Sequence, residues 1–343
     1  MTLLNSYLSN KINIMRIPKI LFVITAVITL FSFQSCNKSS DTTPSPTAPP
    51  SPPVTTSTDT LTTGWSKIVL AGEQLSDIFF NSSTTGYLVG SKVYKSIDGG
   101  NTWTPVLSTG GLFNIFMTND SKAFFAGEPN NIFRTSDGGS SFTNISIGGV
   151  PLDIFFIDNN NGFSVTTNGL YSTVDGGLTW VHQNTTGLPV SGSIGSLSFV
   201  DNSTGWVIKD NAIYKTVGSY LTWQLATVTG GTASIYFSSI YSTSPTNIYA
   251  ANVNGEIFRS TNGGINFSFV GSIGVGQFVD IHFLSDLVGY ACTDKHVFKT
   301  TDGGVNWSKV VSLAQGNLIE LHFTDANHGW VCGSDGTVLI FKQ

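Results

Sequence analysis

Charged residues are scarce in this chain, and basic residues are the scarcer of the two kinds. Only 11% of the 343 residues are charged, and 16 Lys and Arg face 21 Asp and Glu, for a formal net charge of −5. Lys11, Arg16 and Lys19 contribute +3 of that total, so the rest of the chain carries −8. Because nucleic-acid binding needs clustered Lys and Arg, this composition excludes a nucleic-acid partner.

Cysteine is scarce, with three residues in the whole chain. The sequence after Gly64 shows neither helical nor coiled-coil periodicity. Cys292 and Cys332 occupy the same position in two neighbouring copies of a repeat, where other copies have Val89, Ala126, Val165 and Ile208. We therefore expect two small buried thiols, with a disulfide as the alternative in an exported protein. Abundant Gly and Phe, 37 and 24 residues, suit many short strands joined by tight turns.

One short motif recurs along the chain. Its first copy reads KSIDGGNTW from Lys95 to Trp103, and there are six copies in all. A period near forty residues indicates a stacked array of similar units. The motif matches the Asp-box, S-x-D-x-G-x-T-W. We expect the aspartate to accept backbone hydrogen bonds two residues on and the glycines to supply unusual backbone angles. The aromatic residue should pack between sheets. The central positions of the six copies are Asp98, Asp137, Asp175, Gly218, Asn262 and Asp302. Gly218 belongs to a degenerate copy, and we interpret the other five residues as structural.

Each unit also contains an alternating apolar run, a Gly-aromatic step such as GYLVG, and a third short run such as KVYKS. We therefore predict four strands per unit, the fourth beginning at the Trp or Phe. The inner strands number seven and begin near Leu75, Leu112, Leu152, Ile194, Ser238, Phe278 and Leu318. The last unit lacks a fourth strand, and the segment from Gly64 to Val69 has the form of one. The sequence thus predicts an all-β, seven-bladed β-propeller over residues 64–343, closed by an N-terminal strand.

The N-terminus predicts export. Arg16 and Lys19 precede an apolar run that ends at Gln34-Ser35-Cys36, which is typical of a signal peptide over residues 1–35. Phe33-Gln34-Ser35 resembles a loose lipobox of the Bacteroidetes type, so we expect lipid on Cys36; secretion or an uncleaved anchor are the alternatives. Met15 is an alternative start.

Residues 36–63, rich in Ser, Thr and Pro, should form an extended tether. The expected location is the bacterial outer membrane or cell surface.

Polar residues occur two positions before the aromatic position of each inner strand. If the strands surround a channel, these residues form a ring at its mouth, the candidate binding face; the alternative is that they only cap solvated strand starts. The ring residues are Asp77, Asn114, Asp153, Ser196, Ser239, Asp280 and Glu320.

Histidines raise the question of a metal site. His282 and His322 take equivalent positions in the last two blades, where other blades have Phe79, Phe116, Phe155, Ser198 and Tyr241. Aromatic equivalents favour packing between sheets, and no third ligand has suitable spacing. We expect no metal and no cofactor.

Sialidases are the enzymes best known for Asp-boxes, and their chemistry needs three arginines. Beyond the leader the chain has only Arg134 and Arg259, so a sialidase is excluded. Another glycan-active hydrolase or lyase needs only two carboxylates, for which Asp77, Asp153, Asp280 and Glu320 are the candidates. The hairpin acids Asp158, Asp201 and Asp325 are explained as turn caps.

The last two blades carry a composite pattern that resembles the photosystem II stability/assembly factor family of seven-bladed propellers. The pattern is F-x-D-x-x-x-G-W-x-V-G in blade seven, matched at Phe323, Asp325, Gly329, Trp330 and Gly333 with Cys332 at the Val position, and K-T-T-D-G-G-x-x-W in blade six, matched from Lys299 to Trp307. The resemblance covers nearly all of residues 64–343. The resemblance implies the seven-bladed propeller fold. Known members of the family assemble a photosynthetic reaction centre through an arginine-rich patch, and this sequence lacks such a patch.

The sequence therefore favours a lipid-anchored, non-enzymatic propeller that binds a protein or glycan in the periplasm or at the cell surface. The only expected contact with the membrane is the lipid anchor. A scaffold, assembly or recognition role follows from this reading, and no catalytic residue is assigned. The alternative is a glycan-active hydrolase or lyase that uses the carboxylates of the ring.

Overall fold

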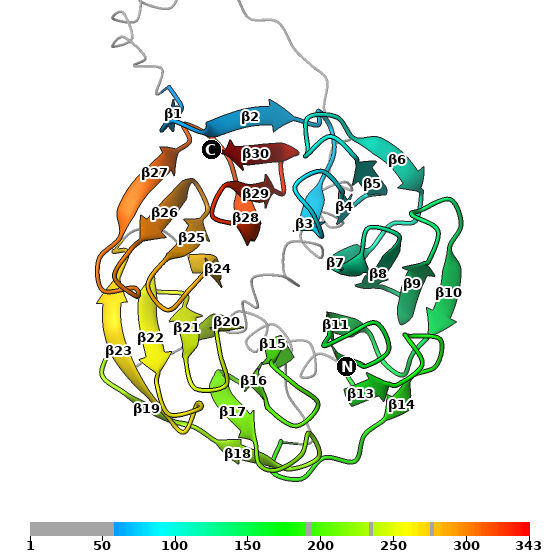
Figure 1. Cartoon of the computed structure of the whole chain (residues 1–343), viewed down its shortest axis with the longest axis vertical. Coiled ribbons are helices and arrows are strands. Elements are labelled where there is room, and N and C mark those ends of the chain that lie inside the picture. The colour runs from blue at the N-terminus through cyan, green and yellow to red at the C-terminus, as the bar shows by residue number, and fades with distance from the viewer. Residues whose placement is uncertain (1–57, 190–193, 233–235, 275–277) are drawn as a thin grey trace, which may run out of the picture.

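The computed structural model describes residues 58–189, 194–232, 236–274 and 278–343. They form seven β-sheets arranged as the blades of a ring (Figure 1). Residues of all seven innermost strands line a cavity at its centre, the central channel. Helices are missing from the described residues, so that part of the chain offers no helix able to cross a membrane. The predicted all-β, seven-bladed propeller is confirmed, while Cys36 and most of the predicted tether lie outside the described residues.

Each blade is a meander that starts at the channel and ends at the rim. The innermost strands are β3 (Leu75–Phe80), β7 (Leu112–Asn119), β11 (Pro151–Phe156), β15 (Ile194–Phe199), β20 (Phe237–Ser242), β24 (Phe278–Phe283) and β28 (Leu318–Asp325). The second strands are β4 (Gly86–Gly90), β8 (Lys122–Gly127), β12 (Gly162–Thr166), β16 (Gly205–Lys209), β21 (Ile248–Asn252), β25 (Gly289–Thr293) and β29 (His328–Gly333).

The outer half of each blade follows the same order. The third strands are β5 (Val93–Ser96), β9 (Asn131–Thr135), β13 (Gly169–Thr173), β17 (Ala212–Thr216), β22 (Glu256–Ser260), β26 (His296–Thr300) and β30 (Thr337–Lys342). The outer strands are β6 (Thr104–Leu107), β10 (Thr143–Ser146), β14 (Val181–His182), β18 (Trp223–Leu225), β23 (Asn266–Ser272), β27 (Ser308–Ser312) and β2 (Trp65–Val69). Blades 1 to 7 are numbered from β3 to β28 by their innermost strand.

Two blades carry a fifth strand at the rim. In blade 5, β19 (Thr227–Thr229) runs parallel to β23. In blade 6, β1 (Thr60–Leu61) pairs antiparallel with β27. The residues of β1 belong to the segment predicted as tether, so the chain already contacts the propeller before the closing strand begins. The additional strands cover the outer edges of these two blades, which would otherwise present unpaired backbone groups.

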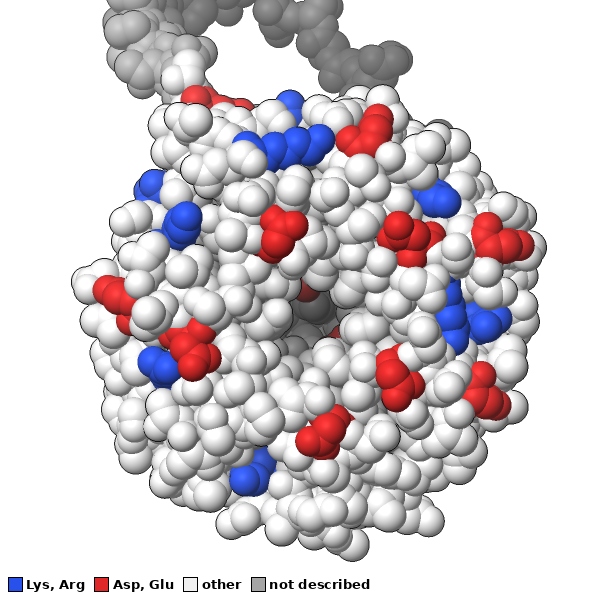
Figure 2. Space-filling view, in the orientation of Figure 1, with Lys and Arg blue, Asp and Glu red and all other residues white. Residues whose placement is uncertain are grey.

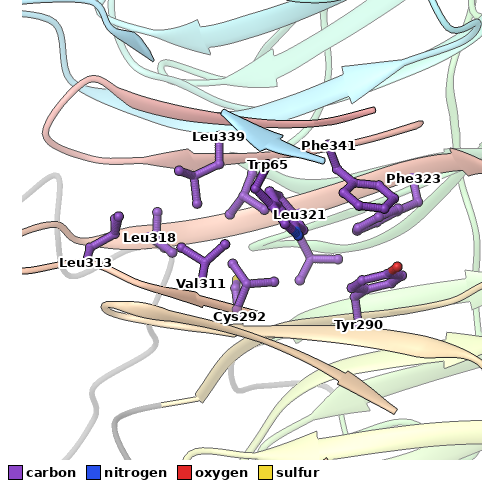
Figure 3. Close-up of a cluster of buried hydrophobic side chains, with 12 residues drawn as sticks. Trp65, Tyr290, Cys292, Val311, Leu313, Leu318, Leu321, Phe323, Leu339 and Phe341 are labelled. Carbon is purple, nitrogen blue, oxygen red and sulfur yellow. The ribbon is translucent and has the colours of Figure 1, made fainter. Parts of the chain in front are cut away.

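The N-terminal strand β2 completes blade 7, as predicted. It pairs antiparallel with β30, in a register that sets Trp65 opposite Phe341 and Val69 opposite Thr337. The Trp65 side chain enters the core between blades 6 and 7, with its ring centroid 5.1 Å from that of Phe341 and 6.5 Å from that of Tyr290 (Figure 3). Because the two chain ends share one sheet, the ring is held closed by hydrogen bonds and apolar packing together.

The Gly-aromatic step fastens neighbouring blades. The aromatic residue of one blade stacks on the last Phe of the next blade's innermost strand, as Trp330 does on Phe80 with ring centroids 3.7 Å apart. The preceding glycine makes room for the Phe of its own blade: a Cβ on Gly329 would lie 2.1 Å from the Phe323 ring. The same stacking joins Phe124 to Phe156, Phe163 to Phe199, Tyr249 to Phe283 and Tyr290 to Phe323.

The Asp-box turns have a structural role in the rim. Asp98 accepts hydrogen bonds from the Thr102 amide and hydroxyl at 3.0 and 2.6 Å, four residues on rather than two. The chain folds back this sharply because Gly99 and Gly100 have φ of 72° and 88°. Asn262 makes the equivalent bond to the Asn266 amide at 3.0 Å.

Cys292 and Cys332 are both reduced thiols with no exposed surface. Cys292 belongs to the core between blades 6 and 7, and Cys332 to the core between blades 7 and 1. The two thiols therefore fill apolar positions in separate cores, as the sequence predicted.

Candidate functional site: the central channel

All seven ring residues line one cavity of about 290 Å³ in the central channel. A register shift, or β-bulge, precedes the ring residue in every innermost strand, for example between Leu75 and Asp77 and between Leu318 and Glu320. A bulge lets two residues of one strand face one residue of its partner, which changes the direction of the following side chain. The repeated bulge thus places the seven polar side chains at one level of the channel.

The ring residues also connect the blades. The Asp77 carboxylate accepts the amide of Ile115 in blade 2 at 2.8 Å, and Asn114 accepts that of Ile154 in blade 3 at 3.1 Å. Asp153 accepts the amide of Leu197 in blade 4 at 3.0 Å. Each bond runs from a ring position to the residue after the next ring position.

The same pattern continues in blades 5 to 7. The Ser239 hydroxyl donates to Asp280 at 2.7 Å and accepts the Ile281 amide at 3.4 Å, and Asp280 accepts the Leu321 amide at 3.4 Å. Asp77, Asn114, Ser239 and Asp280 are buried, while Asp153, Ser196 and Glu320 are partly exposed. The ring is therefore both a channel lining and a set of bonds between blades, and the latter role was not foreseen from the sequence.

Two residues further along each strand lies a second ring, which we call the collar. Its members are Phe79, Phe116, Phe155, Ser198, Tyr241, His282 and His322, all of which line the same cavity. Neighbouring collar rings are in contact: the Phe79 centroid is 5.2 Å from that of Phe116 and 4.1 Å from that of His322. The Phe116–Phe155 and His282–His322 pairs are separated by 5.2 and 5.3 Å.

The two histidines of the collar are neutral at physiological pH. His322 donates through Nε2 to the Phe80 carbonyl at 2.8 Å, which leaves Nδ1 as an acceptor in the neutral ring. Burial lowers the pKa of His322 to about 4, and burial followed by the proximity of His322 lowers the pKa of His282 well below its ordinary value. His282 Nε2 lies 3.1 Å from the hydroxyl of Tyr241, whose pKa burial raises to about 12.

The histidines thus pack against rings of neighbouring blades on the channel side, rather than between the sheets. The described residues contain no group of three or more His, Cys, Asp or Glu able to hold a metal ion. The collar was visible in the sequence only as a set of aromatic equivalents of the two histidines. Its continuity around the channel could not be read from them, because it depends on the bulges that align the strands.

The other candidate residues lie away from the channel. In the Asp-box, the side chain and then the backbone of Ser141 hydrogen-bond to Asp137 and lower its pKa to about 2. Asp158 and Asp201 accept amides two and three residues on, such as Asn160 and Ser203 at 2.7 Å, so the predicted turn caps are confirmed. Arg134 donates to the Gly176 carbonyl and Arg259 to Asn247 at a blade rim.

One face of the molecule shows the channel as a central opening, with acidic side chains visible in its wall (Figure 2). On the surface around it, acidic and basic side chains occur in small separate groups. Such a surface carries no single patch of one charge, and an arginine-rich patch is not visible on this face.

The comparisons with known proteins agree with this architecture. Residues 57–180 match the model of a family described as photosynthesis system II assembly factor YCF48. A solved structure of YCF48 bound to D1 peptide has a TM-score of 0.69 at 19% identity, covering 82% of this chain and 97% of that one. YCF48 from Cyanidioschyzon merolae has a TM-score of 0.68 at 24% identity, covering 81% of this chain and 98% of that one.

Over residues 57–180 the chain is similar to this family, and its described residues share the propeller fold of the two YCF48 structures. No curated protein matches its sequence. Its fold is also similar to that of a catalytically inactive virginiamycin B lyase from Staphylococcus aureus with quinupristin, which has a TM-score of 0.65 at 12% identity and covers 81% of this chain and 99% of that one. At 12% identity the likeness to the lyase concerns the fold and not the activity.

Proposed function

We propose that this chain is a non-enzymatic binding propeller that recognises a protein partner at the mouth of its channel and supports its assembly. The observation that carries the proposal is the likeness to YCF48, one structure of which is bound to a D1 peptide. The partner here need not be photosynthetic, since the peptide belongs to that relative alone.

The bonding of the ring supports binding rather than catalysis. A general acid or base must reach the substrate and exchange a proton with it. Asp77, Asp153 and Asp280 instead accept main-chain amides of a neighbouring blade, so each of these carboxylates already has a structural role between blades. Carboxylates held in this way are suited to maintaining the shape of the channel.

Photo-crosslinking tests the proposed binding face. Lys295 lies in the connection between β25 and β26, on the side where the innermost strands begin, whereas Lys309 lies on β27 at the rim of the same blade. We would introduce a photoreactive residue at either position of the 343-residue chain and irradiate intact cells. One discrete protein adduct at Lys295 and none at Lys309 is the expected result; equal labelling at both positions would contradict a specific mouth.

A glycan is the alternative occupant of the mouth, and the same experiment separates the two. With no protein adduct at either position, binding on a glycan array by the wild-type chain would replace the protein partner by a glycan. Turnover of a bound glycan that is lost in Asp153→Asn and Glu320→Gln would replace the binding function by the hydrolase or lyase alternative.

We further propose that the chain is exported and anchored in the bacterial outer membrane or at the cell surface by lipid on Cys36. The leader and the residues after Cys36 support this part of the proposal. Membrane fractionation tests it: the wild-type chain should sediment with membranes, and Cys36→Ser should move to the soluble fraction. Equal sedimentation of both forms would exclude a lipid anchor at Cys36.

A further inference from the structure

A second pocket lies outside the channel, between the hairpins of blades 5 and 6 that join the innermost strands to the second strands. Its volume is about 640 Å³, which is within the range of about 300–1,000 Å³ typical of small-ligand sites. The pocket is lined by Tyr241 to Ser244 of blade 5 and by Phe283 to Leu287 of blade 6. Both segments lie where innermost strands end, so the pocket is on the side of the ring opposite the proposed mouth.

Leu287 distinguishes this hairpin of blade 6 from the corresponding hairpins of the other blades. Its side chain is 55% exposed and follows Ser285 and Asp286 in the hairpin. The equivalent residues in the other blades are all polar: Thr84, Ser121, Asn160, Ser203, Thr246 and Asn327. An exposed leucine at this position gives the pocket an apolar surface, which suits the C–H face of a ring-shaped ligand.

Serine hydroxyls of both hairpins can serve the pocket as hydrogen-bond donors. A hydroxyl has one O–H group and two lone pairs. Ser285 accepts the amides of Leu287 and Val288 at 3.3 and 3.1 Å, and Ser244 accepts the amides two and three residues on at 3.3 and 3.0 Å. These bonds use the lone pairs and leave the O–H groups for donation. Ser244 can also donate to the Thr246 hydroxyl at 3.3 Å, so Ser285 is the principal donor to a ligand.

Asp286 places hydrogen-bond acceptors beside these donors. Its carboxylate accepts the Thr243 hydroxyl and, at 2.9 Å, the Asn247 side-chain amide, both from the blade 5 hairpin. A carboxylate has about four lone-pair sites, so it can accept bonds from a ligand while these two remain. The two bonds also fix the separation of the hairpins, so the pocket exists before a ligand binds, which lowers the cost of binding.

The combination of donors and acceptors selects the kind of ligand group. A cation would meet the O–H donor of Ser285, and an anion would meet the carboxylate of Asp286. A hydroxyl group of the ligand satisfies both residues, because it donates and accepts. A ring that carries several hydroxyls and also has a C–H face therefore matches the polar groups and Leu287 together.

We propose that the pocket between blades 5 and 6 binds a sugar or other cyclic polyol, with Ser285 and Asp286 bonded to neighbouring hydroxyls of its ring. The sugar can be a free monosaccharide or a unit of a glycan chain, since Ser285 and Leu287 are both exposed. The inference goes beyond the proposed function, because it concerns the opposite side of the propeller and holds without any protein partner.

Matched ligands test the requirement for hydroxyl groups. Both myo-inositol and cyclohexanol have a six-membered carbon ring, but only inositol has a hydroxyl on every ring carbon. Ligand-observed NMR titration of the 343-residue chain would compare them, together with the methyl glycosides of glucose, galactose and mannose. We expect at least one of these polyols to bind at least about tenfold more tightly than cyclohexanol. No preference for any polyol over cyclohexanol would overturn the proposal.

Two variants locate the site in this pocket. Asp286→Asn keeps one acceptor oxygen for Thr243 and removes the charge, which should weaken binding of the preferred polyol about fivefold. Ser285→Ala removes the O–H donor and should weaken the same binding by about the same factor. Melting curves would separate a loss of binding from a loss of folding. Full affinity in both variants would overturn the proposal.

The junction between blades 1 and 2 supplies matched controls, because it repeats the polar pattern outside the pocket. Asp120 accepts the Asn81 side-chain amide at 2.9 Å, and Ser82 accepts the Thr85 amide at 3.1 Å. There the Ser82 hydroxyl donates to Asp120 at 3.4 Å, so donor and acceptor satisfy each other, and Ser121 replaces the exposed leucine. Asp120→Asn and Ser82→Ala should leave polyol binding unchanged. Losses equal to those of the pocket variants would overturn the proposal.

A glycan array separates the two sources of the sugar. An oligosaccharide bound more tightly than its own monosaccharide indicates a glycan chain, and equal affinity indicates a free sugar; either result supports the pocket. Array binding that survives Asp286→Asn would place the sugar elsewhere on the molecule and overturn the inference. The adduct at Lys295 tests the proposed function separately. A chain that binds a polyol in this pocket but forms no adduct at Lys295 would keep this inference and refute the proposed protein partner.

Discussion

Glycine residues in the second strands determine how closely the aromatic rings of neighbouring blades can stack. In blade 7, Gly329 lies against the ring of Phe323, and the next residue, Trp330, stacks on Phe80 of blade 1. A glycine in a strand normally weakens it by removing a packing side chain. Here the loss is offset because the Phe ring occupies the space, so the glycine serves the contact between blades rather than a turn.

Gly329→Ala should therefore destabilise the protein more than an ordinary strand substitution. The new methyl group would lie 2.1 Å from the Phe323 ring, and relieving such overlap costs about 1–3 kcal/mol or more. Gly110→Ala is the control, because nothing lies within 4 Å of the added Cβ. Urea denaturation would measure both variants, and equal midpoints would show that the Phe323 ring moves aside without cost.

The neutral histidines of the collar link stability to pH. The unfolded chain binds a proton at His322 near pH 6.5, the ordinary pKa, but the folded chain does so only near 4. Between these values the unfolded state holds more protons, so the free energy of unfolding falls as the pH falls through this interval. The lowered pKa of His282 acts in the same direction.

His322→Phe should weaken this acid sensitivity. Phe occupies the equivalent position in blades 1 to 3, so the substitution is compatible with the collar. Between about pH 7 and about pH 4.5, the wild-type chain should lose about 2 kcal/mol more unfolding free energy than the variant. His328→Gln, at an exposed pair with Asp325, is the control, and pH profiles of wild type and His322→Phe that run parallel would contradict the assignment.

At the scale of elements, the innermost strand of each blade has two tasks. Its bulge directs the ring residue toward the channel, and the ring side chain then binds the backbone of the next innermost strand. Those strands are the ones that surround the channel and do not pair with one another as a sheet. The polar ring thus supplies the hydrogen bonds between blades that a closed barrel would obtain from its ladders.

Asp77→Ala should be costly and Asp77→Asn mild. The alanine variant would deprive the amides of Ile78 and Ile115 of a carboxylate acceptor, and each buried amide left without one costs about 1–3 kcal/mol. An asparagine keeps the acceptor oxygen, as Asn114 does in blade 2. Thermal denaturation followed by circular dichroism measures the difference; similar losses for both variants would indicate that the charge, not the bond, matters.

At the scale of the whole molecule, ring closure depends on β2, which is far from β30 in sequence. The Trp65 side chain contacts residues of blades 6 and 7 and is 8% exposed. Its burial therefore stabilises a junction between the first and last parts of the chain. A propeller opened at this junction would expose the edge of β30 and associate with other copies through it.

Trp65→Ala should lower the unfolding free energy by about 3–5 kcal/mol, the usual cost of removing a buried large aromatic side chain. Val69→Ala at the exposed end of the same strand should change it by less than about 0.5 kcal/mol. Light scattering after size-exclusion chromatography would show whether Trp65→Ala associates. A monomer with wild-type stability would mean that backbone pairing alone closes the ring.

Much of this architecture could be predicted from the sequence, because the repeated units carry similar residue types at equivalent positions. The blade number, the closing strand and the buried thiols at Cys292 and Cys332 follow from equivalent positions alone. The bonds from Asp77 to Ile115 and from Asp153 to Leu197 could not be predicted. They depend on bulges and on the distance between blades, neither of which changes the pattern of apolar and polar residues.

The attachment of β1 to blade 6 determines how the propeller responds to mechanical load from its N-terminal side. Only two residue pairs join β1 to β27, with the Asp59 carboxylate bound to Lys67 and to the Ala314 amide at 2.8 Å each. Five pairs join β2 to β30. A pull on the chain before Asp59 reaches the weaker contact first, so β1 can detach and rebind while β2 stays in place. The ring would then remain closed under brief forces that lengthen the chain outside it.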